Sequence, residues 1–190
     1  MLFRCPRMVR IEEIQDQSPT VLKDRGNQLF KEKKYEEAAS EYSEALSADC
    51  PEDLRATLLF NRATCWFYLG DYEDCANDCS ESLKLNPQYV KALYRRALAR
   101  EQLGQLQEAV ADFDALFALD SALRAEHLSH YKNLSSKRDA KFESDKEEAM
   151  ASLKSLGNSL LGNFGLSLDQ FKFDKDPVTG NYSVRMDSAS

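Results

Sequence analysis

Five polar residues in the first half of the chain are suited to binding negatively charged groups. Lys23 and Asn27 lie four residues apart, as do Lys91 and Arg95, and this spacing puts each pair on one face of a helix. Asn61 lies between the two pairs in the sequence. Cations supply charge and amides supply oriented hydrogen-bond donors, so three cations with two amides can hold two carboxylates at once. The five residues therefore predict a dicarboxylate-binding site.

No other group of residues predicts catalysis or metal binding. The sequence has no GxxxxGK[ST] phosphate loop, no GxGxxG after a strand, no HExxH and no GxSxG. His127 and His130 are expected to be ordinary surface or cap residues. Cys75 and Cys79 are expected to be small buried hydrophobic residues, because a structural zinc site needs four ligands. We therefore expect no enzymatic activity, no cofactor and no metal.

The composition is that of a soluble helical protein. The chain has 190 residues, of which 43% are hydrophobic and 30% charged, with a net charge of −7, and its seven glycines and five prolines are too few for a sheet-rich fold. No apolar run approaches a membrane span and no block of lysine and arginine stands out, so we expect neither a membrane nor a nucleic acid as partner. An odd number of cysteines, five, and no ordinary secretory signal predict reduced thiols in a cytosolic or nuclear protein, and we expect the cytoplasm.

Three windows of 34 residues repeat the same side-chain pattern. The windows are 19–52, 56–89 and 90–123. Small residues coincide at Gly26, Ala63 and Ala97 and at Ala38, Cys75 and Ala109, and bulky residues coincide at Tyr35, Tyr72 and Leu106. Each window holds two amphipathic stretches separated by a short polar break, which predicts two helices joined by a turn.

This pattern resembles the tetratricopeptide repeat, a helix–turn–helix unit of 34 residues. The resemblance covers residues 19–123 and is carried by these motifs: Gly26-Asn27, Lys34-Tyr35-Glu36-Glu37-Ala38, Asn61-Arg62-Ala63, Gly70-Asp71-Tyr72, Leu85-Asn86-Pro87 and Ala92-Leu93-Tyr94-Arg95-Arg96-Ala97. It implies an all-α fold, a right-handed superhelix of three helix–turn–helix repeats whose first helices line a concave groove. Cys79 departs from the pattern, because the neighbouring windows have Tyr42 and Phe113 there, and Ser121 replaces the closing proline.

The remaining residues predict a cap and an extension. Three repeats leave the apolar face of the last one open, so a cap is required. Apolar residues within 124–156 recur at spacings of three and four, and no proline or glycine interrupts them, which predicts a long capping helix. A coiled-coil seam is the alternative, which the short and irregular apolar repeat does not favour. Gly157, Gly162 and Gly165 are expected to break the helix, and the alternation over 171–186 predicts a β-hairpin within the extension 157–190. Residues 1–18 are expected to form a flexible segment.

The five polar residues match, position by position, the dicarboxylate clamp of chaperone-binding members of this family. The resemblance implies that Lys23, Asn27, Asn61, Lys91 and Arg95 grip the last aspartate and the free α-carboxylate of a Glu-Glu-Val-Asp terminus. Such tails end the cytosolic seventy- and ninety-kilodalton heat-shock chaperones. Further residues on the same face are expected to line the groove and seat the apolar residue before the terminal acid; these are Phe30, Thr64, Phe67 and Leu98.

The prediction is a non-enzymatic adaptor or co-chaperone that assists protein folding. The alternative is an interaction scaffold whose groove binds an unrelated acidic or helical segment. The residues at 156–158, 164–167 and 179–183 carry a closer resemblance to one member of the family, which covers nearly the whole chain except about its first fifteen residues. This extension is expected to dock within the chain or to bind a second protein.

Overall fold

The computed structural model describes residues 18–175 and 182–186. The segment expected to be flexible, 1–18, lies outside the described residues except for Ser18, and so does the turn of the expected hairpin. The described chain divides into two compact units, which meet between Arg138 and Asp139. Most contacts of each unit are made among its own residues.

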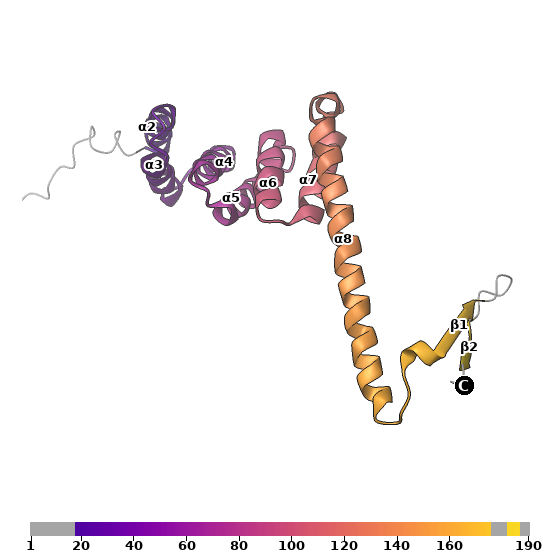
Figure 1. Cartoon of the computed structure of the whole chain (residues 1–190). Coiled ribbons are helices and arrows are strands. Elements are labelled where there is room, and N and C mark those ends of the chain that lie inside the picture. Colours follow the sequence, from indigo (N-terminus) through magenta and orange to yellow (C-terminus); the bar gives the residue numbers. More distant parts are fainter. Residues whose placement is uncertain (1–17, 176–181, 187–190) are drawn as a thin grey trace, which may run out of the picture. The chain divides into compact units, whose positions relative to one another are not determined.

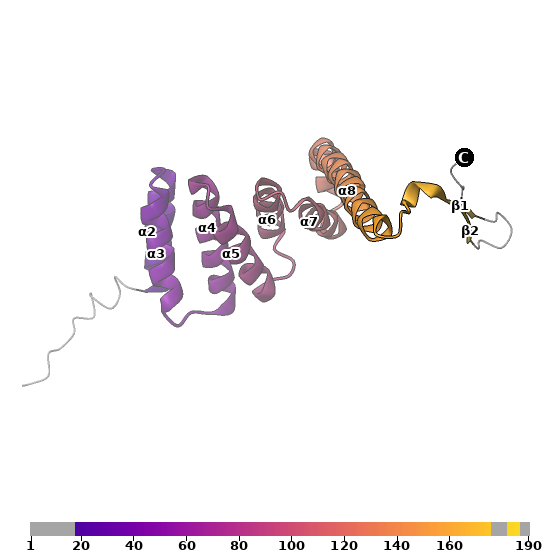
Figure 2. The same ribbon diagram turned by 60° about the horizontal axis from the view of Figure 1, so that its bottom comes forward.

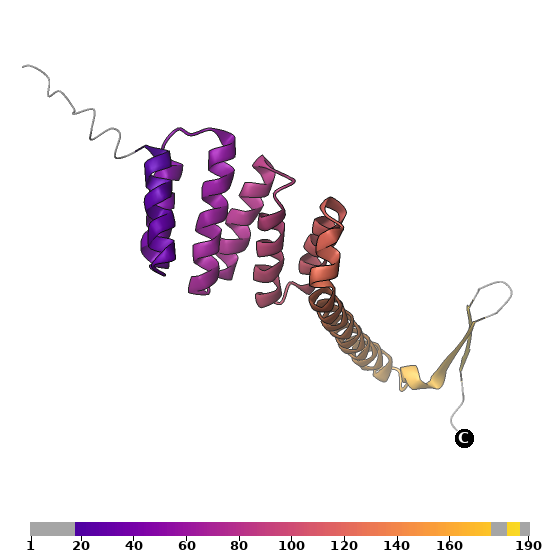
Figure 3. The ribbon, with the colours of Figure 1, turned by 90° about the horizontal axis from the view of Figure 1, so that it is seen from above.

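The first unit is a series of helix pairs, which Figure 1 labels in chain order. The helices are α2 (Pro19–Lys31), α3 (Tyr35–Ser47), α4 (Glu52–Leu69), α5 (Tyr72–Leu85), α6 (Val90–Gln102) and α7 (Leu106–Leu119). Figures 2 and 3 show these helices side by side in sequence order, and neighbours in the chain contact one another. The all-α superhelix of three helix–turn–helix repeats is therefore confirmed.

The turn inside each repeat has the same backbone geometry. A residue with positive φ follows the first helix in all three: Lys33 (63°), Gly70 (90°) and Gly104 (72°). The next amide donates to a carbonyl five residues back, as in Lys34 to Leu29 and Asp71 to Trp66. This left-handed helix end turns the chain back along the first helix. In the first repeat a lysine takes the conformation that glycine takes in the others.

Helix α4 begins four residues before the window that predicted it. Pro51 precedes it, and Glu52 and Asp53 occupy its first turn, where carboxylates favour a helix N-terminus. The residues between the first two windows are therefore helical.

Close packing of the repeats depends on the small residues. Tyr42 is fully buried, and a Cβ on Gly26 would lie 2.6 Å from its ring. In the second repeat Cys79 takes the place of this aromatic ring, and a buried cluster of Ala63, Cys75 and Cys79 forms instead. The expectation that both cysteines are buried is confirmed.

Two buried ion pairs recur at the spacing of the repeats. Arg62 donates to both carboxylate oxygens of Asp78 (2.7 and 2.8 Å) and to the hydroxyl of Ser43. In the next repeat Arg96 donates in the same way to Asp112 and Ser80. Each arginine therefore ties the second helix of its own repeat to the second helix of the preceding one.

Helix α8 (Ala122–Gly162) caps the third repeat with its first part. Leu134 is fully buried in the core of that repeat. Glu101 of α6 bonds to His130 at 2.6 Å and to Lys137 at 3.1 Å, while the ring of His127 stacks on Tyr94. The two histidines are therefore cap residues, as the sequence indicates.

The expectation that Gly157 breaks this helix is wrong. The helix continues through Gly157 to Gly162, and Leu168 packs directly on Gly157, where a Cβ would overlap its side chain. The missing side chain provides room for packing rather than a helix end. The expected capping helix 124–156 is therefore longer at both ends.

The second unit, residues 139–190, joins the rest of α8 to a small hairpin. A 3₁₀ turn (Leu168–Gln170) leads into β1 (Phe171–Lys175), which pairs antiparallel with β2 (Tyr182–Met186). Phe171 lies opposite Met186, so the two strands at the ends of the expected hairpin, 171–186, pair with each other, while its turn lies outside the described residues. In the described part of the chain, none of the helices combines the length and the apolar character needed to cross a bilayer.

Candidate functional site

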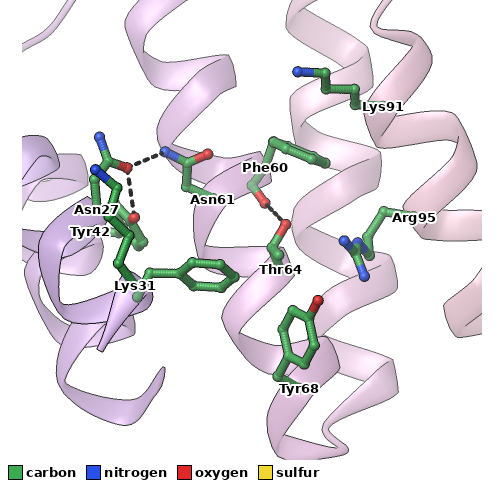
Figure 4. A pocket seen from close by; sticks show the side chains of 10 residues that line it. Asn27, Lys31, Tyr42, Phe60, Asn61, Thr64, Tyr68, Lys91 and Arg95 are labelled. Atoms are coloured by element: carbon green, nitrogen blue, oxygen red, sulfur yellow. Dashed lines mark hydrogen bonds between the residues drawn. The ribbon is translucent and has the colours of Figure 1, made fainter. Parts of the chain in front are cut away.

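A cleft of about 470 Å³ opens on the first unit between α2, α4 and α6. Ten residues line it: Asn27, Phe30, Lys31, Tyr42, Phe60, Asn61, Thr64, Tyr68, Lys91 and Arg95. Figure 4 shows Asn27 and Asn61 on one side of the cleft and Lys91 and Arg95 on the other. The first helix of every repeat contributes to it, and Tyr42 of α3 contributes from a second helix.

The structure brings together most of the residues predicted for the site. Four of the five polar residues line the cleft: Asn27, Asn61, Lys91 and Arg95. Phe30 and Thr64 line it as well, and the hydroxyl of Thr64 donates to the carbonyl of Phe60 at 2.9 Å.

Three predicted residues are not among those that line the cleft. The Nζ of Lys23 lies 3.9 Å from the Asp24 carboxylate, one helical turn before Asn27. Phe67 lies beneath the guanidinium of Arg95 instead of facing the cleft, and Leu98 is partly buried one turn further along α6. Position on the same helix face therefore does not by itself predict which residues line the cleft and which lie beside it.

Asn27 is held in place from two sides. Its Oδ1 accepts a hydrogen bond from the hydroxyl of Tyr42 at 2.9 Å and another from Nδ2 of Asn61 at 3.3 Å. Because Oδ1 takes both bonds, Nδ2 is the group of Asn27 that can donate to a ligand. Burial raises the pKa of Tyr42 well above its usual range, so this hydroxyl remains a donor.

Arg95 is positioned by aromatic rings. The centre of its guanidinium lies 4.7 Å from the centroid of the Phe67 ring and 5.7 Å from that of Tyr68. A cation over a ring face is held by the ring's quadrupole, which fixes the plane of the guanidinium. Its Nε is buried and has no hydrogen-bond partner among the described residues. No described carboxylate pairs with Arg95, so the positive charge that lines the cleft is not neutralised within the described residues.

Tyr68, Tyr35 and Phe30 form an aromatic wall next to these charges. Tyr68 stacks on Tyr35 with centroids 4.8 Å apart, and the edge of Phe30 meets both rings. Tyr68 is 53% exposed, so the wall offers apolar surface to a ligand.

Sequence reasoning missed four lining residues: Lys31, Tyr42, Phe60 and Tyr68. Lys31 follows Asn27 by four residues and Tyr68 follows Thr64 by four, so extending the same helix face would have found both. Tyr42 lies on a second helix, and no spacing within the first helices points to it.

The chemistry of the cleft is that of a binding site for an acidic segment. It combines three cations and oriented amides with aromatic surface, and its ten lining residues include no carboxylate, histidine or cysteine. Within residues 18–175 and 182–186, no group of three or more metal-binding side chains is placed to hold an ion. The hydrogen bond with Cys75 and then burial raise the pKa of Cys79 far above its usual range, so this thiol stays protonated.

Comparison with known proteins gives the class to which this cleft and fold belong. Tetratricopeptide repeat profiles match residues 56–89 and 90–123. Sperm-associated antigen 1A of Danio rerio is 36% identical over 117 residues, which are 58% of this chain. The chain spans 27% of the length of that protein.

Two solved structures show a likeness over a similar share of the chain. The first repeat domain of Spaghetti (RPAP3), bound to the HSP90 peptide SRMEEVD, is 34% identical with a TM-score of 0.58, covering 64% of this chain and 93% of that one. The second domain of human RPAP3, in complex with the HSP70 peptide SGPTIEEVD, is 36% identical with a TM-score of 0.54, covering 60% and 98%. The chain belongs to the tetratricopeptide repeat family. The closer resemblance of nearly the whole chain to tetratricopeptide repeat protein 1 stays a prediction.

Proposed function

We propose that the cleft binds the free C-terminus of an acidic peptide and that the protein is a non-enzymatic adaptor. The observation that carries this is Arg95, a cation stacked on two aromatic rings with a buried Nε that lacks a partner among the described residues. Lys91 on the same helix and the amides of Asn27 and Asn61 across the cleft complete the donor set. Lys23 is expected to swing from Asp24 toward a bound carboxylate.

The ligand we propose is the Glu-Glu-Val-Asp tail of the seventy- and ninety-kilodalton heat-shock chaperones in the cytoplasm. Two repeat domains that resemble this chain are described as bound to HSP90 or HSP70 peptides ending in these four residues. Such a tail offers an α-carboxylate and an aspartate side chain for the donors, and a valine for the apolar surface. The adaptor would thereby assist protein folding by chaperones.

Removal of the Arg95 side chain tests this proposal. A charge-assisted hydrogen bond contributes about 1.5–3 kcal/mol, so Arg95→Ala should weaken binding of SRMEEVD by about 10- to 150-fold in calorimetry. Arg124→Ala is the matched control, because Arg124 also lies over a phenylalanine ring, Phe117, but does not line the cleft. Equal affinity of the Arg95 variant and wild type would refute the site.

Replacement of the ring beneath Arg95 tests its positioning separately. Phe67→Leu keeps apolar volume but removes a cation–π contact of about 0.5–1 kcal/mol, so affinity should fall about two- to fivefold. In an Arg95→Ala background the same change should have no effect. A loss of equal size in both backgrounds would show that Phe67 acts on the peptide or on the fold directly.

A further inference from the structure

Lys31 is a cation of the cleft that the proposed clamp does not use. It ends α2 and lines the cleft one helical turn after Asn27. Figure 4 shows it on the same side of the cleft as Asn27, across from Lys91 and Arg95. In the proposed clamp the other donors hold the α-carboxylate and the last aspartate side chain. The ammonium of Lys31 is therefore left for a further group of the ligand.

The charge of Lys31 is not neutralised within the described part of the chain. The adjacent carboxylate, Glu32, already has a partner on each oxygen, because Gln28 donates to Oε1 at 3.0 Å and the Nζ of Lys34 lies 3.0 Å from Oε2. The ammonium of Lys31 forms no hydrogen bond or ion pair with the residues that the structure describes. Its side chain is exposed, so it can bind a ligand without first breaking a contact.

The cleft continues from Asn27 toward the end of α2. Lys31 lines it there, and Tyr68 lines it one turn beyond Thr64, whereas Lys23, one turn before Asn27, is not among the lining residues. The aromatic wall lies at this end of the cleft and offers apolar surface to a peptide. We therefore place the residues that precede the terminus of a bound peptide here, beside Lys31.

The spacing along α2 indicates which residue of the peptide Lys31 meets. Four residues of helix separate Asn27 from Lys31, which is a rise of about 6 Å. In an extended peptide, side chains two residues apart point to the same side and lie about 6.6 Å apart. The two spacings agree. An extended peptide whose last residue is held at Asn27 thus brings the side chain two residues earlier next to Lys31.

We propose that Lys31 binds the side chain of the glutamate two residues before the C-terminus. The cleft then selects Glu-x-Asp at a free carboxyl terminus, which narrows the ligand class of the proposed function on which this inference rests. In SRMEEVD that residue is the second glutamate. The first glutamate stands one residue earlier and points to the opposite side of an extended chain, away from Lys31.

Three peptides test which glutamate the cleft recognises. An exposed ion pair contributes modestly, so calorimetry with wild type should find SRMEQVD about three- to fivefold weaker than SRMEEVD. SRMQEVD keeps the second glutamate and should be weaker by less than about twofold. Equal losses with the two glutamine peptides, or a larger loss with SRMQEVD, would overturn the assignment of the second glutamate to Lys31.

Variants of Lys31 test the lysine itself. Lys31→Gln should bind SRMEEVD and SRMEQVD with equal affinity, and Lys31→Glu should prefer SRMEKVD to SRMEEVD, the reverse of wild type. Lys132→Gln is the matched control, because Lys132 is an exposed lysine of α8 that does not line the cleft. It should keep the preference of wild type. Both lysines are exposed, so circular dichroism should show the same helicity in all four proteins.

The outcomes separate this inference from the proposed function. If wild type binds SRMEEVD and Arg95→Ala weakens it, but Lys31→Gln still distinguishes SRMEEVD from SRMEQVD, the clamp stands and the role of Lys31 is overturned. If wild type binds none of the peptides, both the clamp and the role of Lys31 are overturned.

Discussion

Loss of a single hydroxyl from the core should weaken peptide binding at the cleft. Tyr42→Phe keeps the ring that packs on Gly26 and removes only the donor that bonds to Asn27 at 2.9 Å. A neutral hydrogen bond contributes about 0.5–1.5 kcal/mol, so stability should fall by about 1 kcal/mol, or about 2–4 °C in Tm for a chain of this size. Asn27 then keeps only the longer bond from Asn61 and presents its Nδ2 less firmly.

The effect on binding should be smaller than that of removing Asn27 itself. Asn27→Ala removes a whole charge-assisted hydrogen bond and should lower affinity by about 10- to 150-fold. Tyr42→Phe removes only the bond that orients Asn27, so we expect affinity to fall by about three- to tenfold. If Tyr42 acts through Asn27, the double variant should bind no worse than Asn27→Ala alone, which is a coupling of about 0.7–1.4 kcal/mol.

Calorimetry with SRMEEVD and urea unfolding measure both parts of this prediction. Tyr131→Phe is the control, because it removes a hydroxyl bonded to Asp114 at the same distance, 2.9 Å, away from the cleft. Losses that add in the double variant, or unchanged affinity in Tyr42→Phe, would refute the link between this core residue and the site.

Two further predictions concern the stability of the repeats. Arg62→Leu should lower the free energy of unfolding by about 3–5 kcal/mol in urea, because it leaves the buried Asp78 carboxylate without its cation. Replacing both residues by apolar ones should recover most of this loss. A loss below about 1 kcal/mol in Arg62→Leu would contradict the account. Burial alone would raise the pKa of Glu101, but hydrogen bonds from His130 and Lys137 lower it below its usual value. The stabilisation from this contact is therefore complete above the unfolded-state pKa and is lost as pH falls through the lower pKa of the folded state. The stability gap between wild type and Glu101→Gln should therefore narrow as pH falls below the unfolded-state value of about 4.5, and a gap that widens or stays constant with falling pH would contradict it.

The architecture of the repeats was predictable because local constraints agree with one another. Gly26 marks where Tyr42 must approach, and Gly70 and Gly104 mark left-handed turns, so small residues report the packing directly. Gly157 misled the prediction for the same reason. A glycine gives room for a neighbour as well as freedom to the backbone, and the sequence does not say which of the two is used.

The site was predictable only as far as helix periodicity reaches. The spacing of Lys91 and Arg95 places both on one helix face, and both line the cleft. The same periodicity includes Phe67, yet its ring lies under Arg95, because side-chain rotamers and the crossing of neighbouring helices decide which residues reach the opening. Tyr42 was missed since it reaches the cleft from the second helix of its repeat.

The central claim is that the cleft recognises a free carboxyl terminus, and calorimetric titration with SRMEEVD in its free and C-terminally amidated forms tests it most directly. Amidation removes one of the two carboxylates and leaves every side chain unchanged. We expect the amidated peptide to bind at least about tenfold more weakly than the free one. Added salt should also lower the affinity of the free peptide. Equal affinity for the two peptides would contradict the clamp and would indicate that the groove binds an acidic or helical segment by another mode.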